Sequence, residues 1–219
     1  MMSGKPKCSF MLIIIFFLFV VGCATHKIVE KNPAVSVEEF FYAVQKNDLL
    51  EAERMIIEGV NVNAKNTKKY TPLMLAAEHG NIDTLKLLLN AGADINTQGC
   101  SDWTALTTAA FEGHTDAVRT LIEAGADIEL KDYEGFTAMM ITAMEGKVDV
   151  IKLLLDKGAL ITAKDQYGKT ALMLAEENSN ENAAQVLREA VKELFERVIL
   201  LMKKEQWVLS ALVLCSLII

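Results

Sequence analysis

A single spacing recurs through the middle of this 219-residue chain and constrains its fold more than any other feature. Threonine recurs every 33 residues, at Thr71, Thr104, Thr137 and Thr170, and glycine recurs with the same period at Gly59, Gly92, Gly125 and Gly158 and again at Gly80, Gly113 and Gly146. Because independent markers share one period, this segment is a tandem array of short structural units. One such unit cannot bury its apolar face alone, so neighbouring units are expected to stack around a shared core.

Each unit carries the signals of two short helices. In the first full unit, Thr71 is a good helix N-cap and Pro72 suits the first helical position. Gly80 stands where the chain must turn sharply between the helices, and Gly92 follows the second helix as a terminator. Apolar residues of the second helix fall at helical spacing, which predicts core packing; they are Leu85, Leu88 and Leu89.

The repeated segments resemble the ankyrin repeat over residues 37–200. They include TPLMLAAEHGNIDTLKLLLNAGADIN and TALTTAAFEGHTDAVRTLIEAGADIE. The resemblance implies an all-α ankyrin repeat solenoid, in which each unit has two antiparallel helices and a projecting hairpin loop. The predicted units are an N-terminal capping repeat at 37–65, repeats at 66–98, 99–131 and 132–164, and a C-terminal repeat with an extended helix at 165–204.

The ends of the array depart from the pattern. Glu38 stands where the first unit would have its threonine, and Asn47 replaces the turn glycine, a position that Asn tolerates. Near the C-terminus, Val191 stands where the next helix-ending glycine would be. The last helix is therefore predicted over 181–204, with an apolar stripe formed by Leu187, Val191, Leu194, Val198 and Leu201.

The family often places a histidine two residues after the proline position, where it joins a polar network with the threonine. The four repeats have Met74, Thr107, Met140 and Met173 there. The network is therefore not expected, and flexible thioethers are predicted to fill the space.

The N-terminal segment predicts export. Lys5 and Lys7 precede an unbroken apolar run at residues 10–21, the pattern of a secretory signal. A helix of this length rises only about 18 Å, short of the ~30 Å hydrocarbon core of a bilayer. Residues 20–23 (VVGC) resemble the lipobox of a bacterial lipoprotein signal. That resemblance implies cleavage after residues 1–22, lipidation of Cys23 with fatty acyl chains such as palmitate, and a linker at 23–36; the alternative is an uncleaved anchor.

A second apolar run ends the chain. Residues 207–219 contain no charged side chain and form most of a predicted hydrophobic tail at 205–219. As a helix this run rises about 20 Å, less than a full span. Three interpretations remain open: the tail dips into the membrane, it packs on a partner helix or another copy, or it results from a damaged or shortened reading frame.

Composition and spacing predict no chemistry. With 22 Lys and Arg against 29 Asp and Glu, the net charge of −7 argues against nucleic acid, which proteins bind by neutralising phosphates. No histidine is spaced for a catalytic triad, and Cys100 is the one cysteine outside the signal, the lipid site and the tail. No glycine-rich phosphate loop is present. We therefore predict no catalytic residue, metal site, cofactor or small-molecule substrate.

The resemblance implies that the loop tips and the exposed side of the first helices recognise protein partners. The positions concerned carry large apolar side chains bordered by carboxylates. The predicted partner-binding residues are Tyr70, Trp103, Phe111, Tyr133, Phe136 and Met144, with an acidic rim of Glu78, Glu112 and Glu145. Aromatic residues anchor interfaces because they bury much area at low entropic cost. The alternative is that these rings pack against neighbouring loop tips.

These features together predict a non-enzymatic interaction scaffold. Its expected location is the bacterial cell envelope, where the lipid holds it to a membrane with the repeats in the periplasm or outside the cell. Two alternatives remain: a structural envelope component, and a cytosolic or secreted adaptor that modulates a partner enzyme.

Overall fold

A computed structural model describes residues 36–218, with side chains up to residue 203. The predicted signal segment, the lipidation site Cys23 and nearly all of the linker lie outside the described residues. Within residues 36–218 every regular element is a helix, as the all-α prediction requires.

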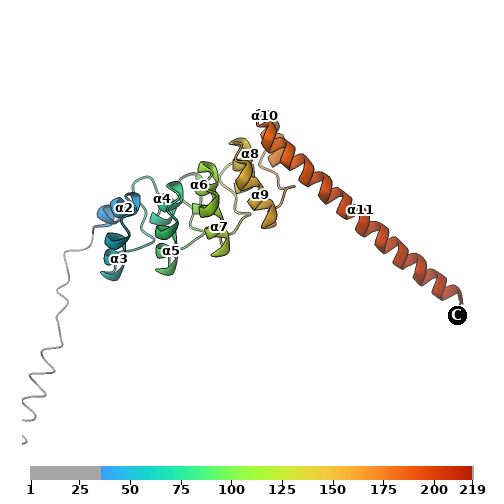
Figure 1. Ribbon diagram of the computed structural model, residues 1–219, viewed down its shortest axis with the longest axis horizontal. Coiled ribbons are helices and arrows are strands. Elements are labelled where there is room, and N and C mark those ends of the chain that lie inside the picture. The colour runs from blue at the N-terminus through green and yellow to red at the C-terminus, as the bar shows by residue number, and fades with distance from the viewer. Residues whose placement is uncertain (1–35, 219) are drawn as a thin grey trace, which may run out of the picture. The chain divides into compact units, whose positions relative to one another are not determined.

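The helices form two rows, which Figure 1 shows. The first helices of the units are α2 (Val37–Gln45), α4 (Pro72–Glu78), α6 (Ala105–Glu112), α8 (Ala138–Met144) and α10 (Ala171–Glu177). The second helices are α3 (Leu49–Ile57), α5 (Ile82–Asn90), α7 (Thr115–Glu123), α9 (Val148–Asp156) and α11 (Glu181–Ile218), and a 3-10 turn, η1 (Cys100–Asp102), lies in one loop. Consecutive first helices pack together, and the second helices pack in the same order. The paired helices predicted from the repeat are confirmed.

Small side chains at one position of the first helices allow this close packing. Ala77, Ala110 and Ala143 occupy equivalent positions and are all fully buried. The second helices contribute a matching column of larger side chains, Leu88, Leu121, Leu154 and Leu187, each also fully buried. Fully burying a leucine contributes about 1.5–3 kcal/mol, so the core is held mainly by contacts that repeat from unit to unit.

The threonines cap the first helices as predicted, with one exception. The Oγ1 atoms of Thr71, Thr104 and Thr170 accept the backbone N–H three residues later, at 3.2, 3.2 and 3.5 Å. Thr137 precedes α8 at the same position, but its buried Oγ1 makes no such bond.

The expectation for the histidine position is correct in two units and wrong in two. Met74 and Met140 are buried and fill the space. Thr107 instead accepts the Thr104 backbone N–H at 2.7 Å, because its short hydroxyl can fold back onto the cap and restore a polar network. Met173 is 49% exposed, since α10 begins the last unit of the stack.

The turns between paired helices share one backbone conformation. The five equivalent residues have positive φ: Asn47 (55°), Gly80 (66°), Gly113 (86°), Gly146 (67°) and Ser179 (59°). The prediction that Asn47 replaces the turn glycine is confirmed. Non-glycine residues stand at the two ends of this series, where each terminal unit has a neighbour on one side.

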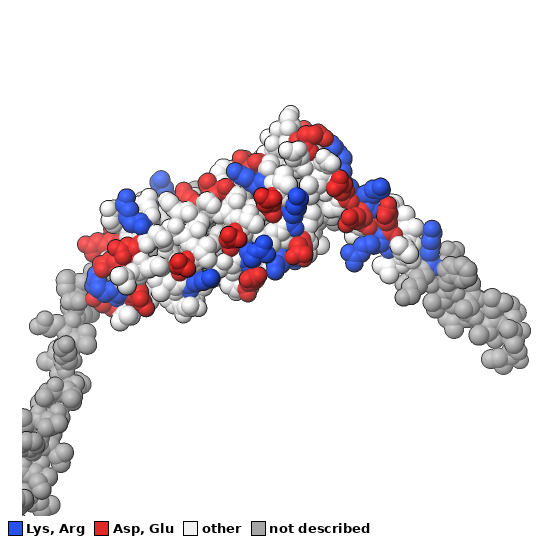
Figure 2. Space-filling view, in the orientation of Figure 1, with Lys and Arg blue, Asp and Glu red and all other residues white. Residues whose placement is uncertain are grey.

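Long side chains hold neighbouring loops at a fixed spacing. Lys65 Nζ donates to the Gln98 carbonyl oxygen at 2.8 Å, and Gln98 Nε2 donates to the Lys131 carbonyl at 3.1 Å. Lys131 Nζ then donates to the Lys164 carbonyl at 2.8 Å. Each bond joins equivalent positions of adjacent units, so the loops follow the same period as the helices. On the face drawn in Figure 2, acidic and basic residues are interspersed along the helices.

The last helix differs from its prediction. The helix α11 continues to Ile218 instead of ending near 204, because residues 181–218 contain no glycine or proline to stop it. Its predicted stripe is buried at Leu187, but Leu194 and Leu201 are 42% and 62% exposed. Within residues 36–218, no helix combines enough length with enough unbroken apolar sequence to cross a bilayer.

Two loop glycines provide a matched test of the stacking. Gly125 and Gly135 have φ of 96° and 84°, so alanine at either position carries a left-handed strain of about 1–2 kcal/mol. A Cβ at Gly135 would lie 2.9 Å from the Gln166 backbone nitrogen, whereas a Cβ at Gly125 meets nothing within 4 Å. We expect Gly135→Ala to lower the free energy of unfolding, measured by urea titration, clearly more than Gly125→Ala. Equal losses would contradict the loop contact.

Candidate functional site

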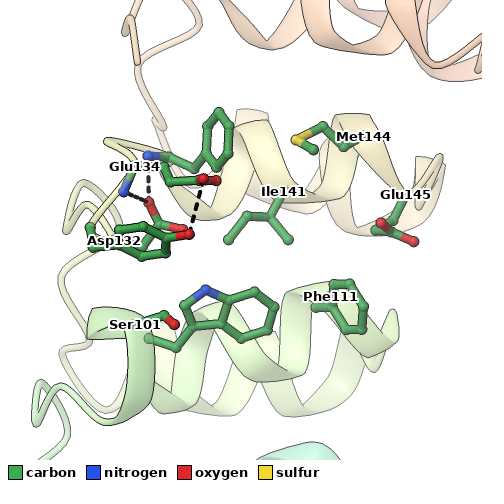
Figure 3. Close-up of a pocket in the computed structure, with 10 residues that line it drawn as sticks. Ser101, Phe111, Asp132, Glu134, Ile141, Met144 and Glu145 are labelled. Atoms are coloured by element: carbon green, nitrogen blue, oxygen red, sulfur yellow. Dashed lines mark hydrogen bonds between the residues drawn. The ribbon is translucent and has the colours of Figure 1, made fainter. Parts of the chain in front are cut away.

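Six of the predicted partner-binding residues come together around one pocket between the units of α6 and α8. They are Trp103, Phe111, Tyr133, Phe136, Met144 and Glu145, and the other lining residues are Ser101, Asp132, Glu134 and Ile141. The pocket has a volume of about 280 Å³. Figure 3 shows Phe111 and Ser101 on one wall and Ile141, Met144 and Glu134 on the other.

The repeat explains why these side chains meet. Trp103 and Phe136 each stand directly before the threonine that precedes a first helix, so both belong to the loop side of the first helices. Phe111 and Met144 lie in the last turns of α6 and α8, one repeat apart. Side chains from the loop and from the last helical turn of two adjacent units therefore line the same pocket.

The aromatic residues are only partly available to a partner. The Trp103 and Phe111 rings contact each other with centroids 5.2 Å apart and planes tilted by 58°, an arrangement that aromatic pairs favour. Phe136 packs against the core, and Tyr133 is 62% exposed. Trp103 and Phe111 thus pack on each other and Phe136 packs on the core, while all three also line the pocket.

Tyr70 and Glu78 lie in a different cleft, so the predicted stripe is split in two. That second cleft, of about 650 Å³, lies between the first two units and is also lined by Phe41, Tyr42 and Leu75. Burial of the Tyr70 side chain in this cleft raises the pKa of its phenol, and nearby charges, among them Glu78 and Glu112, raise it further. Glu112 is exposed and lines neither cleft.

A loop tip orients the acidic end of the pocket. The Asp132 side chain is buried, and its Oδ1 accepts the backbone N–H groups of Glu134 and Phe136 at 2.9 and 2.8 Å. Asn66 and Asp165 make the same pair of bonds in other loops. In the loop between those of Asn66 and Asp132, the equivalent residue is Gly99, which has no side chain to make these bonds. That loop tip is formed instead by η1, with Ser101 in a left-handed conformation.

The local electrostatic field at this end is negative. Tyr133 donates its hydroxyl hydrogen bond to Glu134 Oε1 at 3.0 Å. That bond, followed by the charge of Glu134, holds the pKa of the Tyr133 phenol above its usual value, and Asp132 adds to the effect. Each charged residue that lines the pocket is acidic.

The two histidines of the described part both lie against main-chain carbonyl oxygens. His114 Nε2 lies 3.0 Å from the Glu78 carbonyl oxygen, and His79 Nδ1 lies 2.9 Å from that of Leu75. Among residues 36–203, no three His, Cys, Asp or Glu side chains gather in a way that could hold a metal ion.

Sequence reasoning missed Ile141, Asp132 and Glu134. Ile141 is one repeat beyond Thr108 and two beyond Leu75, which lines the second cleft, although Ile141 itself is only 4% exposed. Asp132 stands at the position of Asn66 in the first loop tip. The repeat period could have located Ile141 and Asp132. The position of the Glu134 side chain depends on how the loop tip around Asp132 folds.

A family model described as ankyrin repeats (3 copies) matches residues 40–132 and 129–196. The chain belongs to the ankyrin repeat family. Members of this family are in general non-enzymatic scaffolds for protein–protein interaction. The fowlpox virus (strain NVSL) ankyrin repeat protein FPV222 is 39% identical over 54 residues, which is 25% of this chain and 7% of the viral protein. This chain therefore matches only a small part of that relative.

The negative field near Tyr133 can be tested directly. We expect Glu134→Gln to lower the pKa of the Tyr133 phenol toward its ordinary value of about 10, because the carboxylate that holds the proton is removed. The measurement is an NMR titration of labelled tyrosine. Glu145→Gln, at the opposite end of the pocket (Figure 3), should leave this pKa unchanged. An unaltered Tyr133 pKa in Glu134→Gln would refute the assigned contact.

Proposed function

We propose that this ankyrin repeat protein is a non-enzymatic scaffold that binds a protein partner through the pocket between α6 and α8. The observation that carries the proposal is the apolar floor formed by the half-buried Trp103, Phe111 and Met144 together with Ile141, which is only 4% exposed. Such a cluster on packed helices is suited to accept an anchor side chain from a partner.

The pocket is largely formed before a partner arrives. The contact between Trp103 and Phe111 restrains both rings, so binding pays less side-chain entropy than it would with free rotamers. A specific interface of ordinary size buries about 800 Å² on each partner. The pocket would supply its centre, and the surrounding loop tips and helix ends would supply the rim.

We further propose that the protein is held to a bacterial membrane through lipidated Cys23, with the repeats in the periplasm or outside the cell. The support is the sequence of residues 20–23 (VVGC) after the apolar run. The exposed apolar side chains of α11 from Leu194 onward continue toward the hydrophobic tail, which supports a second contact with the membrane. More than one such attachment is needed for stable anchoring.

Loss of the anchor residues should abolish partner capture. The experiment uses the full chain in detergent micelles as bait in bacterial envelope extracts. A partner that cross-links to the bait is identified, and its recovery is quantified by mass spectrometry. We expect Trp103→Ala with Phe136→Ala to reduce recovery about tenfold or more, as hot-spot residues do. Tyr133→Ala, at an exposed position, should also weaken capture.

The matched control is Phe195→Ala, which removes an aromatic ring that is 69% exposed on α11. It should leave recovery of the partner unchanged. Circular dichroism confirms that each variant keeps its helices. Unchanged recovery with the two pocket variants, both folded, would reject the pocket as the binding site.

Intact mass spectrometry of the membrane-extracted protein tests the anchor. We expect a mature chain that begins at Cys23 and carries the added mass of its acyl chains. A chain that retains residues 1–22 without lipid would contradict this. In Cys23→Ser, release by carbonate would deny the tail an anchoring role.

A further inference from the structure

The pocket between α6 and α8 has a charge pattern that restricts what can occupy it. Figure 3 shows Asp132 and Glu134 at its loop-tip end, Glu145 at the opposite end and Ile141 between them. An occupant that spans the pocket meets apolar surface in the middle and carboxylates on either side. Among the described residues, no basic side chain lines the pocket to neutralise them.

The carboxylates at the two ends are held differently. Asp132 Oδ1 is fixed by two backbone N–H bonds, and Glu134 accepts the Tyr133 hydroxyl. Glu145 is exposed at the C-terminal end of α8, and its carboxylate makes no hydrogen bond or ion pair within the described part of the chain. One end is therefore pre-oriented for a cation, and the other end can adjust to it.

The apolar floor is confined to the two middle units. One position of four successive units holds Glu78, Phe111, Met144 and Glu177. Glu177 is paired with Lys169 at 2.6 Å, and Glu78 lines the second cleft. The apolar floor therefore does not extend beyond the units of α6 and α8 in either direction along the stack.

The volume suits an anchor side chain better than a separate small molecule. At about 280 Å³ the pocket is just below the ~300–1,000 Å³ range of small-molecule sites. The thioether of Met144 can adapt to different apolar shapes. One large apolar side chain, with its backbone across the opening, fits this space.

We infer that the pocket holds an apolar side chain of a partner peptide segment whose flanking residues are lysine or arginine. The inference rests on the proposed function, because it names the chemistry of the partner at the same pocket. The flanking cations pair with Glu145 at one end and with Asp132 and Glu134 at the other. Carboxylate pairs with guanidinium or ammonium groups combine charge attraction with directed hydrogen bonds.

The test selects binders from a phage-displayed library of random dodecapeptides with the full chain in detergent micelles as target. An enriched peptide is then synthesised and titrated by fluorescence anisotropy. We expect enriched peptides to carry basic residues on both sides of a leucine, methionine or aromatic residue. Glu134→Gln with Glu145→Gln should weaken binding of that peptide about tenfold or more, since two charge-assisted contacts are lost.

The control is Glu193→Gln with Glu196→Gln, which removes the same charge from exposed positions of α11; the affinity should not change. The enriched peptides could lack flanking basic residues and still bind less tightly to Trp103→Ala or Tyr133→Ala. That result would overturn the charge inference but would still support the proposed pocket. Peptides unaffected by both of these variants, or no enrichment at all, would overturn the pocket as well.

Discussion

Close stacking of alanine-bearing helix faces is the constraint on which the rest of this structure depends. Ala77, Ala110 and Ala143 are fully buried at equivalent positions, and larger side chains there would separate the first helices. The same contact recurs in each unit, so the loops and helix ends inherit its period. A single unit exposes too much apolar surface to be stable alone, and the units therefore stabilise one another.

A stack of this kind separates stability from recognition. The buried positions repeat closely, whereas the last turn of the first helix holds Phe111 and Met144 in the middle units and glutamates on either side. Such changes alter the surface without disturbing the core. The binding chemistry of the proposed pocket can thus differ from unit to unit while the backbone remains regular.

Local irregularity adds to this effect at one loop. The aspartate or asparagine that organises the other tips is replaced by Gly99, and the tip turns through the left-handed Ser101 and Asp102. The Ser101 carbonyl oxygen then accepts the Tyr133 backbone N–H at 3.2 Å. The irregular tip therefore meets the regular one directly beside the pocket, where Trp103 and Tyr133 are presented together.

The sequence by itself determined the stacked helical pairs, three of the four threonine caps, the positive φ at Asn47 and the buried leucine column, because these follow from periods of 33 and 3.6 residues. Only the tertiary structure decided that the aromatic stripe divides into two clefts and that Glu134 joins one of them. It also revealed the full length of α11 and the exposure of Leu201. The exposure of a side chain, and the pocket that it lines, depend on which residues surround it in space. The spacing of residues along the sequence does not specify those neighbours.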